Sequence, residues 1–321
     1  MIVLTGGAGF IGSCILAELN ARGVSDIYVV DHIEHSSLKK KNLINKDYEE
    51  YFDKKDFRGR LTANRLKKVT AIIHMGACSS TTLNDELYFE ENNYQYTRDL
   101  ALWALKNEAR FIYASSAATY GDGSLGYSDE ESLIPQLKPL NFYGQSKQKF
   151  DKWVLDHNAS GRMAGLKFFN VFGPNEYHKD DMRSVIAKAY PRVVQEGKIS
   201  LFKSYKPEYA DGEQKRDFIY VKDAVDVVMY FFDHPDINGI YNVGTGKARS
   251  WNDVARALFA AVGKKPTIEY IEMPEPLRGQ YQYFTEADMK KLRSSGYRRP
   301  FTELEEAVKD YAGYLKNMSH C

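Results

Sequence analysis

The sequence predicts an α/β fold: a doubly wound parallel sheet with helices on both faces, followed by a smaller C-terminal lobe. Three observations predict it. Short apolar runs alternate with longer amphipathic stretches through the first half of the chain, a glycine-rich turn separates the first run from the first amphipathic stretch, and the rhythm becomes irregular after Gly173. Strands that are covered on both faces read as continuous apolar runs, and strand–helix alternation is typical of parallel sheets.

The elements follow in order along the chain. Strands are expected at 2–5, 27–31, 71–77, 110–117 and 165–173, because each run is short and largely apolar. Helices are expected at 10–23, at 84–107 and from Asn141 onward. Beyond Gly173, strands at 217–221 and 239–244 flank a helix at 222–234, and the amphipathic stretch 301–317 predicts a closing helix.

Composition narrows the class of protein. The chain has 321 residues, 43% of them hydrophobic and 27% charged, which suits a globular enzyme of about two domains with a sizeable core. A formal net charge of +1 argues against a nucleic-acid partner. No apolar run approaches the ~20 residues of a membrane span, and no signal peptide precedes the first strand. The three cysteines, Cys14, Cys78 and Cys321, form neither a disulfide framework nor a metal-ligand spacing, so we expect a cytoplasmic protein without a metal.

The stretch TGGAGFIG lies between the first expected strand and the first expected helix. Gly7, Gly9 and Gly12 satisfy G-x-G-x-x-G, while Gly6, Gly9 and Gly12 satisfy the related G-x-x-G-x-x-G spacing. Such glycines let backbone N–H groups approach a pyrophosphate at a helix N-terminus, and Asp31 could bind the adenosine ribose. A structural turn is the alternative. We therefore expect residues 1–173, completed by 217–244, to form a dinucleotide-binding domain, and 174–321 to form mainly the substrate-binding lobe.

The choice between NAD and NADP stays open on chemistry alone. Asp31 favours NAD, because a carboxylate repels a 2′-phosphate. Lys39, Lys40 and Lys41 follow closely and could neutralise that phosphate, although a lysine run is often only a solvated loop.

Tyr143 and Lys147 stand four residues apart at the start of a predicted helix, downstream of a strand that ends in Ser115 and Ser116. Such a pair often occurs by chance. Beside a dinucleotide it has a chemical use, because a lysine one turn away and a positive nicotinamide ring would lower the pKa of the tyrosine from its ordinary value of ~10. With a serine hydroxyl on the same substrate oxygen, the tyrosine could remove a proton while hydride leaves the carbon.

Several longer stretches make the sequence resemble a known family. TGGAGFIG, ASSAATYG, YGQSK and RDFIYVKDAVD resemble the extended short-chain dehydrogenase/reductase superfamily, which has a Rossmann-type fold. HMGACSSTT, ENNYQYT, FFNVFGPNEYHKDDM and RGQYQYFTEADMKKLRSSGY are similar to the ADP-L-glycero-D-manno-heptose 6-epimerase family within it. That family inverts carbon 6 of the heptose in a nucleotide-sugar precursor of the lipopolysaccharide inner core.

The resemblance implies the cofactor contacts. The glycine turn contributes Gly6, Gly9, Phe10, Ile11 and Gly12. The other implied contacts are Asp31, His32, Lys39, Lys54, Met75, Gly76, Ala77, Cys78, Ser79, Asn92, Lys147, Val171 and Lys179. The family is described as NADP-dependent and homopentameric, so the resemblance favours NADP and implies a homo-oligomer.

The resemblance also implies the catalytic and substrate contacts. Tyr143 is the base, Lys147 is its partner, Ser116 assists, and Lys179 is a second acid/base. Inversion requires the ketone formed at carbon 6 to turn over in the pocket, so a second proton donor is useful; without the resemblance, Lys179 would be read as a surface lysine. The implied contacts with the ADP-sugar are Ser116, Asn170, Asp181, Lys188, Phe202, Lys203, Ser204, Tyr205, Arg216 and Tyr281.

The chain departs from the family pattern at several positions. Asp181 stands where a small hydroxyl residue is expected, Lys188 replaces a histidine, Met75 replaces a glutamate, and residues 206–214 lengthen the substrate loop. These departures bear on the sugar contacts. Two alternative functions also stay open: a nucleotide-sugar 4-epimerase or 4,6-dehydratase, and a non-catalytic dinucleotide sensor. The dehydratase would want an acidic pair after Ser116, and the sensor a broken Tyr-x-x-x-Lys; the sequence has neither.

Overall fold

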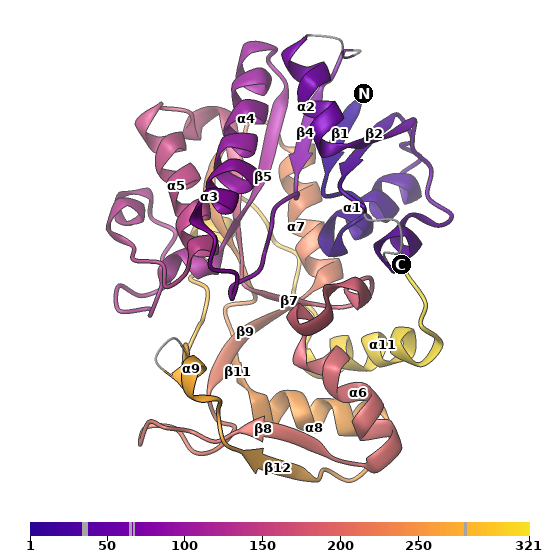
Figure 1. Ribbon diagram of the computed structural model, residues 1–321, viewed down its shortest axis with the longest axis vertical. Coiled ribbons are helices and arrows are strands. Elements are labelled where there is room, and N and C mark those ends of the chain that lie inside the picture. The colour runs from indigo at the N-terminus through magenta and orange to yellow at the C-terminus, as the bar shows by residue number, and fades with distance from the viewer. Residues whose placement is uncertain (34–37, 64–65, 67, 279–280) are drawn as a thin grey trace.

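A computed structural model of the chain describes residues 1–33, 38–63, 66, 68–278 and 281–321 (Figure 1). Its main body is a seven-stranded sheet in the order β10-β6-β5-β4-β1-β2-β3. The strands are β1 (Ile2–Thr5), β2 (Ile27–Asp31), β3 (Glu50–Asp53), β4 (Ala71–His74), β5 (Arg110–Ser116), β6 (Met163–Phe168) and β10 (Gly239–Val243). Every pairing between them is parallel, which confirms the predicted fold class.

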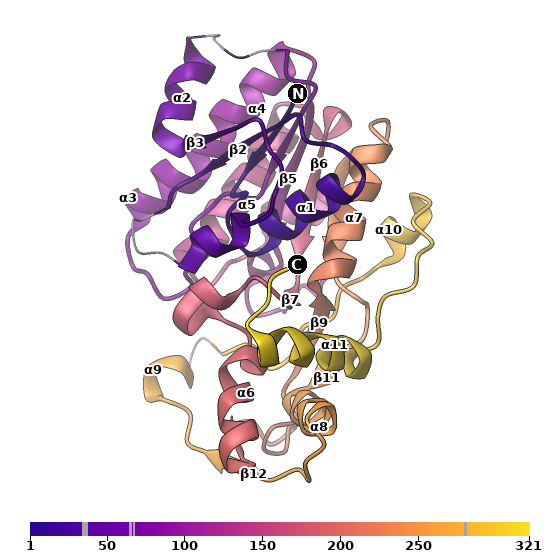
Figure 2. The ribbon, with the colours of Figure 1, turned by 90° about the vertical axis from the view of Figure 1, so that its right-hand side faces the viewer.

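Helices cover both faces of this sheet (Figure 2). On one face lie α1 (Phe10–Ala21) and α7 (Val221–Asp233), and on the other α2 (Lys54–Thr62), α4 (Tyr96–Lys106) and α5 (Phe142–Asp156). The helix expected at 84–107 is three consecutive segments: α3 (Glu86–Phe89), the π-helical η2 (Glu90–Gln95) and α4. A π-helical turn is wide, and such turns are frequent at functional sites.

The strand expected at 165–173 is divided. β6 ends at Phe168 in the large sheet, and β7 (Asn170–Phe172) belongs to a three-stranded sheet in the order β11-β9-β7. That sheet also holds β9 (Lys215–Tyr220), which covers the strand expected at 217–221, and β11 (Ala248–Ser250). The chain therefore changes sheets at the buried Phe169, which places Asn170 beside the ends of the large sheet.

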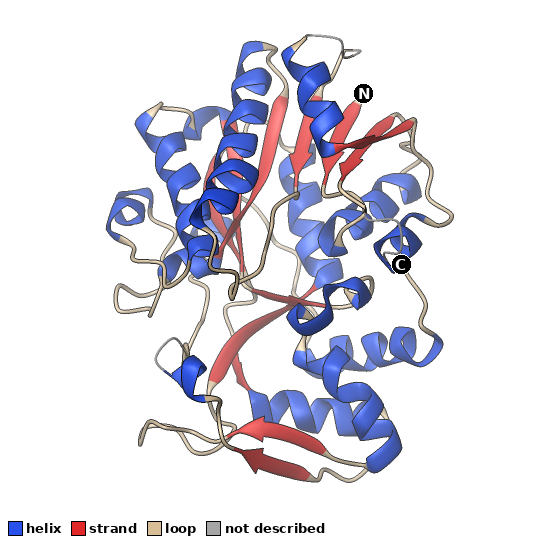
Figure 3. Ribbon diagram, viewed as in Figure 1, coloured by secondary structure: helices blue, strands red, loops and turns tan. Residues whose placement is uncertain are grey.

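The remaining elements form a lobe below the carboxyl ends of the strands (Figure 3). It contains α6 (Val185–Glu196), β8 (Ile199–Phe202), α8 (Trp251–Ala261), β12 (Ile268–Ile271) and α11 (Leu304–Asn317), the expected closing helix. The shorter segments of the chain are η1 (Leu38–Leu43), η3 (Ala117–Tyr120), η4 (Glu131–Gln136), η5 (Ser160–Arg162), η6 (Tyr177–Met182), α9 (Glu275–Arg278) and α10 (Lys290–Ser294). Among the described helices, none is both long enough and apolar enough to span a membrane.

One hydrophobic cluster continues from the large sheet into the lobe. It includes Ile15 of α1 and Val228 of α7, and also Leu201, Phe259 and Tyr311 from the lobe. A second cluster fills the opposite face of the sheet, between the strands and α4 and α5. The lobe thus shares its core with one face of the sheet.

Candidate active site

The glycine turn between β1 and α1 is tightly folded. Gly6 has a φ of +67°, which favours glycine. A Cβ atom on Gly12 would lie 2.1 Å from the carbonyl oxygen of Gly6, so the helix packs against the turn only without a side chain there. Gly9 begins α1 without a side-chain cap, which leaves backbone N–H groups of the first turn available to an anion. This geometry is compatible with the pyrophosphate site that the sequence predicts.

Asp31 ends β2 and is nearly buried, with 8% of its surface exposed. Its carboxylate accepts hydrogen bonds from the backbone N–H groups of Ala8 (2.9 Å) and His32 (2.7 Å). Lys39 Nζ lies 2.5 Å from the Asp31 Oδ1 atom. Asp31 and Lys39 are therefore paired at the carboxyl end of β2, where a ribose would bind.

Two further predicted cofactor contacts, Lys54 and Asn92, bond to each other. Lys54 begins α2 and donates a hydrogen bond to Asn92 Oδ1 at 2.7 Å. A nearby asparagine was not found from the sequence: the Asn42 side chain donates to the carbonyl oxygens of Ala8 and Asn175, each at 3.0 Å. It links the glycine turn to the segment that carries Lys179.

Asn93 holds the loop that follows β4 in place, and it is a second residue that was not predicted from the sequence. Asn93 is 2% exposed, lies in η2, and makes a pair of hydrogen bonds with the backbone of Cys78 (2.9 and 3.0 Å). It also donates to Ser146 Oγ at 3.0 Å. The side chain thus fixes the predicted cofactor loop, residues 75–79, against helix α5. Its place beside the predicted contact Asn92 was the only signal in the sequence.

Helix α5 begins where the sequence predicts, because Asn141 caps it by accepting a hydrogen bond from the Gly144 N–H at 2.8 Å. The cap places Tyr143 in the first turn, next to Ser116 at the end of β5. Burial raises the pKa of Tyr143, and a hydrogen bond with Ser116 partly opposes this. Burial is the largest influence on the Tyr143 pKa here, and the lowering expected from Lys147 together with a nicotinamide stays a prediction.

Lys147 is 5% exposed and donates a hydrogen bond to the Ala114 carbonyl at 2.8 Å. Burial lowers the pKa of Lys147 to about 8, while the negative charge of Asp151 opposes this. The lysine can therefore lose its proton at mildly alkaline pH.

We expect the turnover rate to fall as pH rises through about 8, because Lys147 then loses the charge that supports a phenolate at Tyr143. In Lys147→Arg the guanidinium keeps its charge, so the fall should move to higher pH. The measurement is kcat as a function of pH for both proteins. An identical alkaline midpoint would assign the ionisation to another group.

A buried ion pair lies beneath these residues. Asp151 follows Lys147 by one helical turn, and its Oδ2 atom lies 2.6 Å from Lys167 Nζ with both side chains fully buried. The Asp151 carboxylate also accepts hydrogen bonds from Tyr113 (3.0 Å) and Ser115 (2.7 Å). The cluster joins α5 to β5 and β6 directly below Ser116. A lysine within the apolar run 165–173 was the signal that could have revealed it.

Lys179 lies in η6, and its Nζ atom is 5.4 Å from the centre of the Phe10 ring. Burial lowers the pKa of Lys179, and Glu176 partly opposes this. Lys179 is thus a desolvated amine beside the first turn of α1, and the surface reading of this lysine is not supported.

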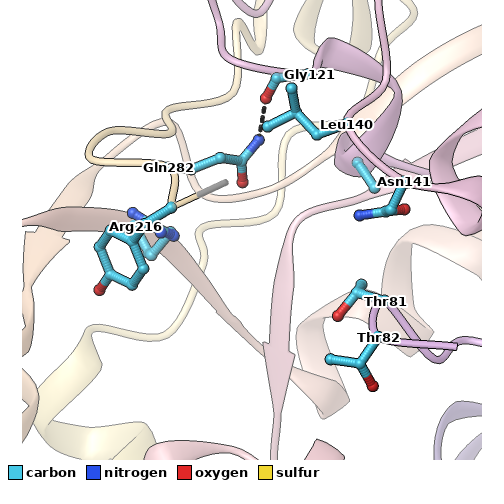
Figure 4. A pocket seen from close by; sticks show the side chains of 9 residues that line it. Thr81, Thr82, Gly121, Leu140, Asn141, Arg216 and Gln282 are labelled. Carbon is cyan, nitrogen blue, oxygen red and sulfur yellow. Dashed lines mark hydrogen bonds between the residues drawn. The ribbon is translucent and has the colours of Figure 1, made fainter. Parts of the chain in front are cut away.

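A pocket of about 210 Å³ opens between the sheet and the lobe (Figure 4). Arg216 and Gln282 lie on one side of it, and Asn141, Thr81 and Thr82 lie on the other. Tyr281 also lines it.

Arg216 is 7% exposed, and its guanidinium lies 5.1 Å from the ring centre of Tyr281 and 5.9 Å from that of Trp251. Burial lowers its pKa. Among the described residues, no carboxylate forms an ion pair with Arg216, so the guanidinium suits an anionic ligand.

A second pocket of about 340 Å³ lies between α6, β8 and β12, and Tyr281 lines this one too. Its floor is largely apolar, with Phe202, Trp251 and Ile271, and Lys188 stands at its edge. Tyr281 is therefore the wall common to both pockets.

The structure does not bring every predicted substrate residue to these pockets. Tyr205 is exposed and Lys203 is partly exposed, and both bond to Glu272, Lys203 at 2.7 Å. Ser204 bonds to neighbours in its own loop, and Asp181 is exposed. Residues 34–37, which lie between His32 and Lys39, and residues 279–280 of the stretch RGQYQYFTEADMKKLRSSGY lie outside the described residues.

Comparison with known proteins decides the family. Residues 2–244 match the NAD dependent epimerase/dehydratase family. A relative from Nitratidesulfovibrio vulgaris, named ADP-L-glycero-D-manno-heptose-6-epimerase, is 54% identical over 97% of this chain and 96% of its own length. The chain belongs to the ADP-L-glycero-D-manno-heptose-6-epimerase family. A Fusobacterium nucleatum member with the same name is 46% identical over 97% of this chain and 96% of its own.

Two solved structures share the fold, and one of them is a member of this heptose-epimerase family. The Helicobacter pylori ADP-L-glycero-D-manno-heptose-6-epimerase has a TM-score of 0.82 at 28% identity, covering 98% of this chain and 96% of its own. The Thermus thermophilus UDP-glucose 4-epimerase, solved with NAD, has a TM-score of 0.80 at 26% identity, covering 99% of each chain. The resemblance found in the sequence is confirmed. The protein is an isomerase that depends on a nicotinamide dinucleotide.

Proposed function

We propose that the chain interconverts ADP-D-glycero-D-manno-heptose and ADP-L-glycero-D-manno-heptose by transient oxidation at carbon 6, with tightly bound NADP, and that it thereby supplies heptose for the lipopolysaccharide core. The observation that carries this proposal is the presence of two partly buried proton-handling groups on different elements. Tyr143 with Lys147 is on α5, and Lys179 is on η6, beside the first turn of α1. A simple dehydrogenase needs only the first of these groups.

Inversion explains the need for the second group. Oxidation makes carbon 6 planar, and the ketone must turn over before it is reduced from its other face. Its oxygen then leaves Tyr143 and needs another proton donor. Lys179 supplies one, because its desolvated amine has a lowered pKa and can release a proton more easily than an exposed lysine.

The chain's own groups divide the remaining work. Tyr143 takes the hydroxyl proton, Ser116 holds the same substrate oxygen, and Lys147 supports the phenolate. A bound oxidised nicotinamide would accept the hydride, return it, and add a positive charge beside Tyr143. The hydrogen bonds of Asn93 to Cys78 and Ser146 hold the loop after β4 against α5.

The two pockets suit the two ends of an ADP-sugar. We infer that the heptose enters the pocket beside Asn141 and that the adenosine enters the apolar pocket lined by Phe202 and Trp251. Arg216 then contacts the diphosphate between them, since its buried guanidinium lacks an acidic partner in the described chain and Tyr281 lines both pockets.

For the cofactor, the pairing of Asp31 with Lys39 favours NADP, because the lysine offsets the carboxylate that would repel a 2′-phosphate. We expect the purified protein to carry mainly NADP. In Lys39→Met the ratio of NADP to NAD released on denaturation should fall at least tenfold. Lys106→Met, which removes an exposed lysine in the last turn of α4, is the control. An unchanged ratio in Lys39→Met would remove Lys39 from cofactor selection.

Lys179→Ala is expected to reduce inversion at carbon 6 by at least about 10²-fold, because the turned-over oxygen loses its proton donor. The dinucleotide should stay bound, which its release on denaturation measures. Lys106→Ala, at an exposed position in the last turn of α4, is the control for loss of a lysine. Turnover near that of the unchanged protein would contradict the role of Lys179.

The function is tested by mixing the purified protein with ADP-D-glycero-D-manno-heptose and no added cofactor. Proton NMR follows the configuration at carbon 6, and the denatured supernatant is assayed for dinucleotide. Conversion to the L-glycero epimer is the expected result. No conversion with dinucleotide present, together with turnover of UDP-glucose, would favour the 4-epimerase alternative.

We also propose that the protein is a cytoplasmic homo-oligomer, a pentamer by family resemblance. Its three cysteines carry free thiols, which suits a reducing compartment. Leu87 is 81% exposed on α3 and Leu102 is 49% exposed on α4, and contact with another copy would cover such apolar surface.

A further inference from the structure

Two cysteines far apart in the sequence lie side by side in the fold. Cys14 is on α1 and is 5% exposed, while Cys321 follows α11 and is partly exposed. Their Sγ atoms are 2.9 Å apart. Figures 1 and 2 agree in placing this end of the chain beside α1. Neither thiol takes part in the reaction at carbon 6.

The segment that carries Cys321 is held in place by several hydrogen bonds. The backbone N–H of Cys321 donates to Asn175 Oδ1 at 3.1 Å, and its carbonyl accepts from Lys46 Nζ at 2.5 Å. Tyr177 donates to the carbonyl of Ser319 at 2.7 Å. Because these bonds come from η6 and the segments beside it, the approach of the two sulfur atoms is built into the fold.

The surroundings of the two thiols differ in a way that suits thiol exchange. The hydrogen bond from Cys14 lowers the pKa of Cys321, and Lys46 and Lys222 add to this while burial opposes it. Burial raises the pKa of Cys14. Cys321 is thus the more acidic and more accessible thiol, and a thiolate is the attacking form in disulfide exchange.

We propose that Cys14 and Cys321 form a redox modification site, a thiol pair that closes to a reversible intramolecular disulfide when it meets a small-molecule disulfide. The geometry carries the proposal, since two free sulfur atoms in contact need only a small shift to reach the bond length of about 2.05 Å. It is independent of the identity of the sugar substrate.

The exchange balances in two steps. The Cys321 thiolate attacks one sulfur of the small disulfide, forms a mixed disulfide with it, and releases the other half as a thiolate. That thiolate takes the Cys14 proton. The Cys14 sulfur then attacks the Cys321 sulfur, breaks the mixed disulfide and releases the second small thiolate. Two protein thiols are oxidised, and one small disulfide is reduced to two thiols.

The bond would join the end of the chain to the helix that follows the glycine turn. His320 Nδ1 lies 2.7 Å from Asn42 Oδ1, and the Asn42 amide donates to the carbonyls of Ala8 and Asn175. Oxidation would therefore fix the whole contact between the terminal segment, the glycine turn and the segment that leads to Lys179. We expect the oxidised protein to unfold at higher temperature and to release its dinucleotide more slowly.

The test treats the purified holoprotein with glutathione disulfide and maps the peptides without reduction. The expected product is a Cys14–Cys321 linked peptide that dithiothreitol separates. Cys78→Ser should still give this link, whereas Cys321→Ser should abolish it. A stable glutathione adduct on Cys321, or no link at any ratio of disulfide to thiol, would overturn the proposal.

A second measurement shows whether the disulfide changes the stability of the protein and its release of dinucleotide. Oxidation should raise the midpoint of thermal unfolding by roughly 5 °C or more, because a cross-link over a long loop restricts the unfolded chain. Dithiothreitol should reverse the shift, and Cys321→Ser should show none. Identical midpoints and identical rates of dinucleotide release in linked and reduced protein would overturn the proposal that the disulfide fixes the terminal segment against the glycine turn.

Discussion

Replacing Tyr143 by phenylalanine is expected to lower kcat for inversion at carbon 6 by about 10²–10⁴-fold, the usual contribution of a positioned acid/base. The change removes one hydroxyl group and keeps the ring. Asn141 still caps α5 and Lys147 still bonds to Ala114, so the site should keep its shape. Proton NMR of the ADP-heptose measures the rate, and the dinucleotide released on denaturation shows whether the cofactor site is intact.

The matched control is Tyr94→Phe, which removes a hydroxyl from a partly buried tyrosine in η2 that contacts Arg98 and Lys149. It should leave the rate within about twofold, because the ring that contacts Arg98 and Lys149 is kept. A Tyr143→Phe protein that retained more than a tenth of the rate, with its dinucleotide bound, would assign the proton transfer to another group.

Lys167→Met is expected to destabilise the fold by about 3–5 kcal/mol, because it leaves the Asp151 carboxylate buried without its cation. Both side chains are fully buried, so water does not replace the lost partner. The measurement is the free energy of unfolding from urea denaturation. Activity should also fall, since Asp151 follows Lys147 by one turn on α5.

Two companion variants make the result specific. Lys149 is on α5, the helix that carries Asp151, and Lys149→Met breaks its pair with Glu90 of η2, which should cost less than about 1 kcal/mol. The double change Asp151→Leu with Lys167→Met removes both charges and should recover part of the lost stability. A cost for Lys167→Met no larger than for Lys149→Met would show that the buried pair contributes little.

The large sheet and the start of the site could be predicted because local patterns determine them. The glycine turn, Asp31 and the helix beginning at Phe142 follow from spacing and from short-range caps. Strand β3 and most of the lobe were not predicted, since their short, mixed runs become strands only through contacts with distant segments. Phe169, where the chain changes sheets, reads like any other residue of an apolar strand.

The electrostatic state of the site needed the structure. Sequence spacing placed Lys147 beside Tyr143, but only the burial of both groups shows that the pKa of the tyrosine rises in the protein alone. The roles of Asn93 and Asp151 were not predicted, because their partners Cys78 and Lys167 lie 15 and 16 positions away in the chain. The role implied for Lys179 rested on resemblance, and its contact with Phe10 adds a physical basis.

The hydrophobic core that the sheet and the lobe share determines how the protein unfolds. Since Ile15 and Val228 belong to the same cluster as Phe259 and Tyr311, loss of the lobe would expose one apolar face of the sheet. The two parts should therefore denature in one cooperative transition, and amides in α8 and α1 should exchange with solvent at similar free energies of opening. A protease would then find few partially unfolded states to cut, and motion during turnover would be confined to the loops around the crevice.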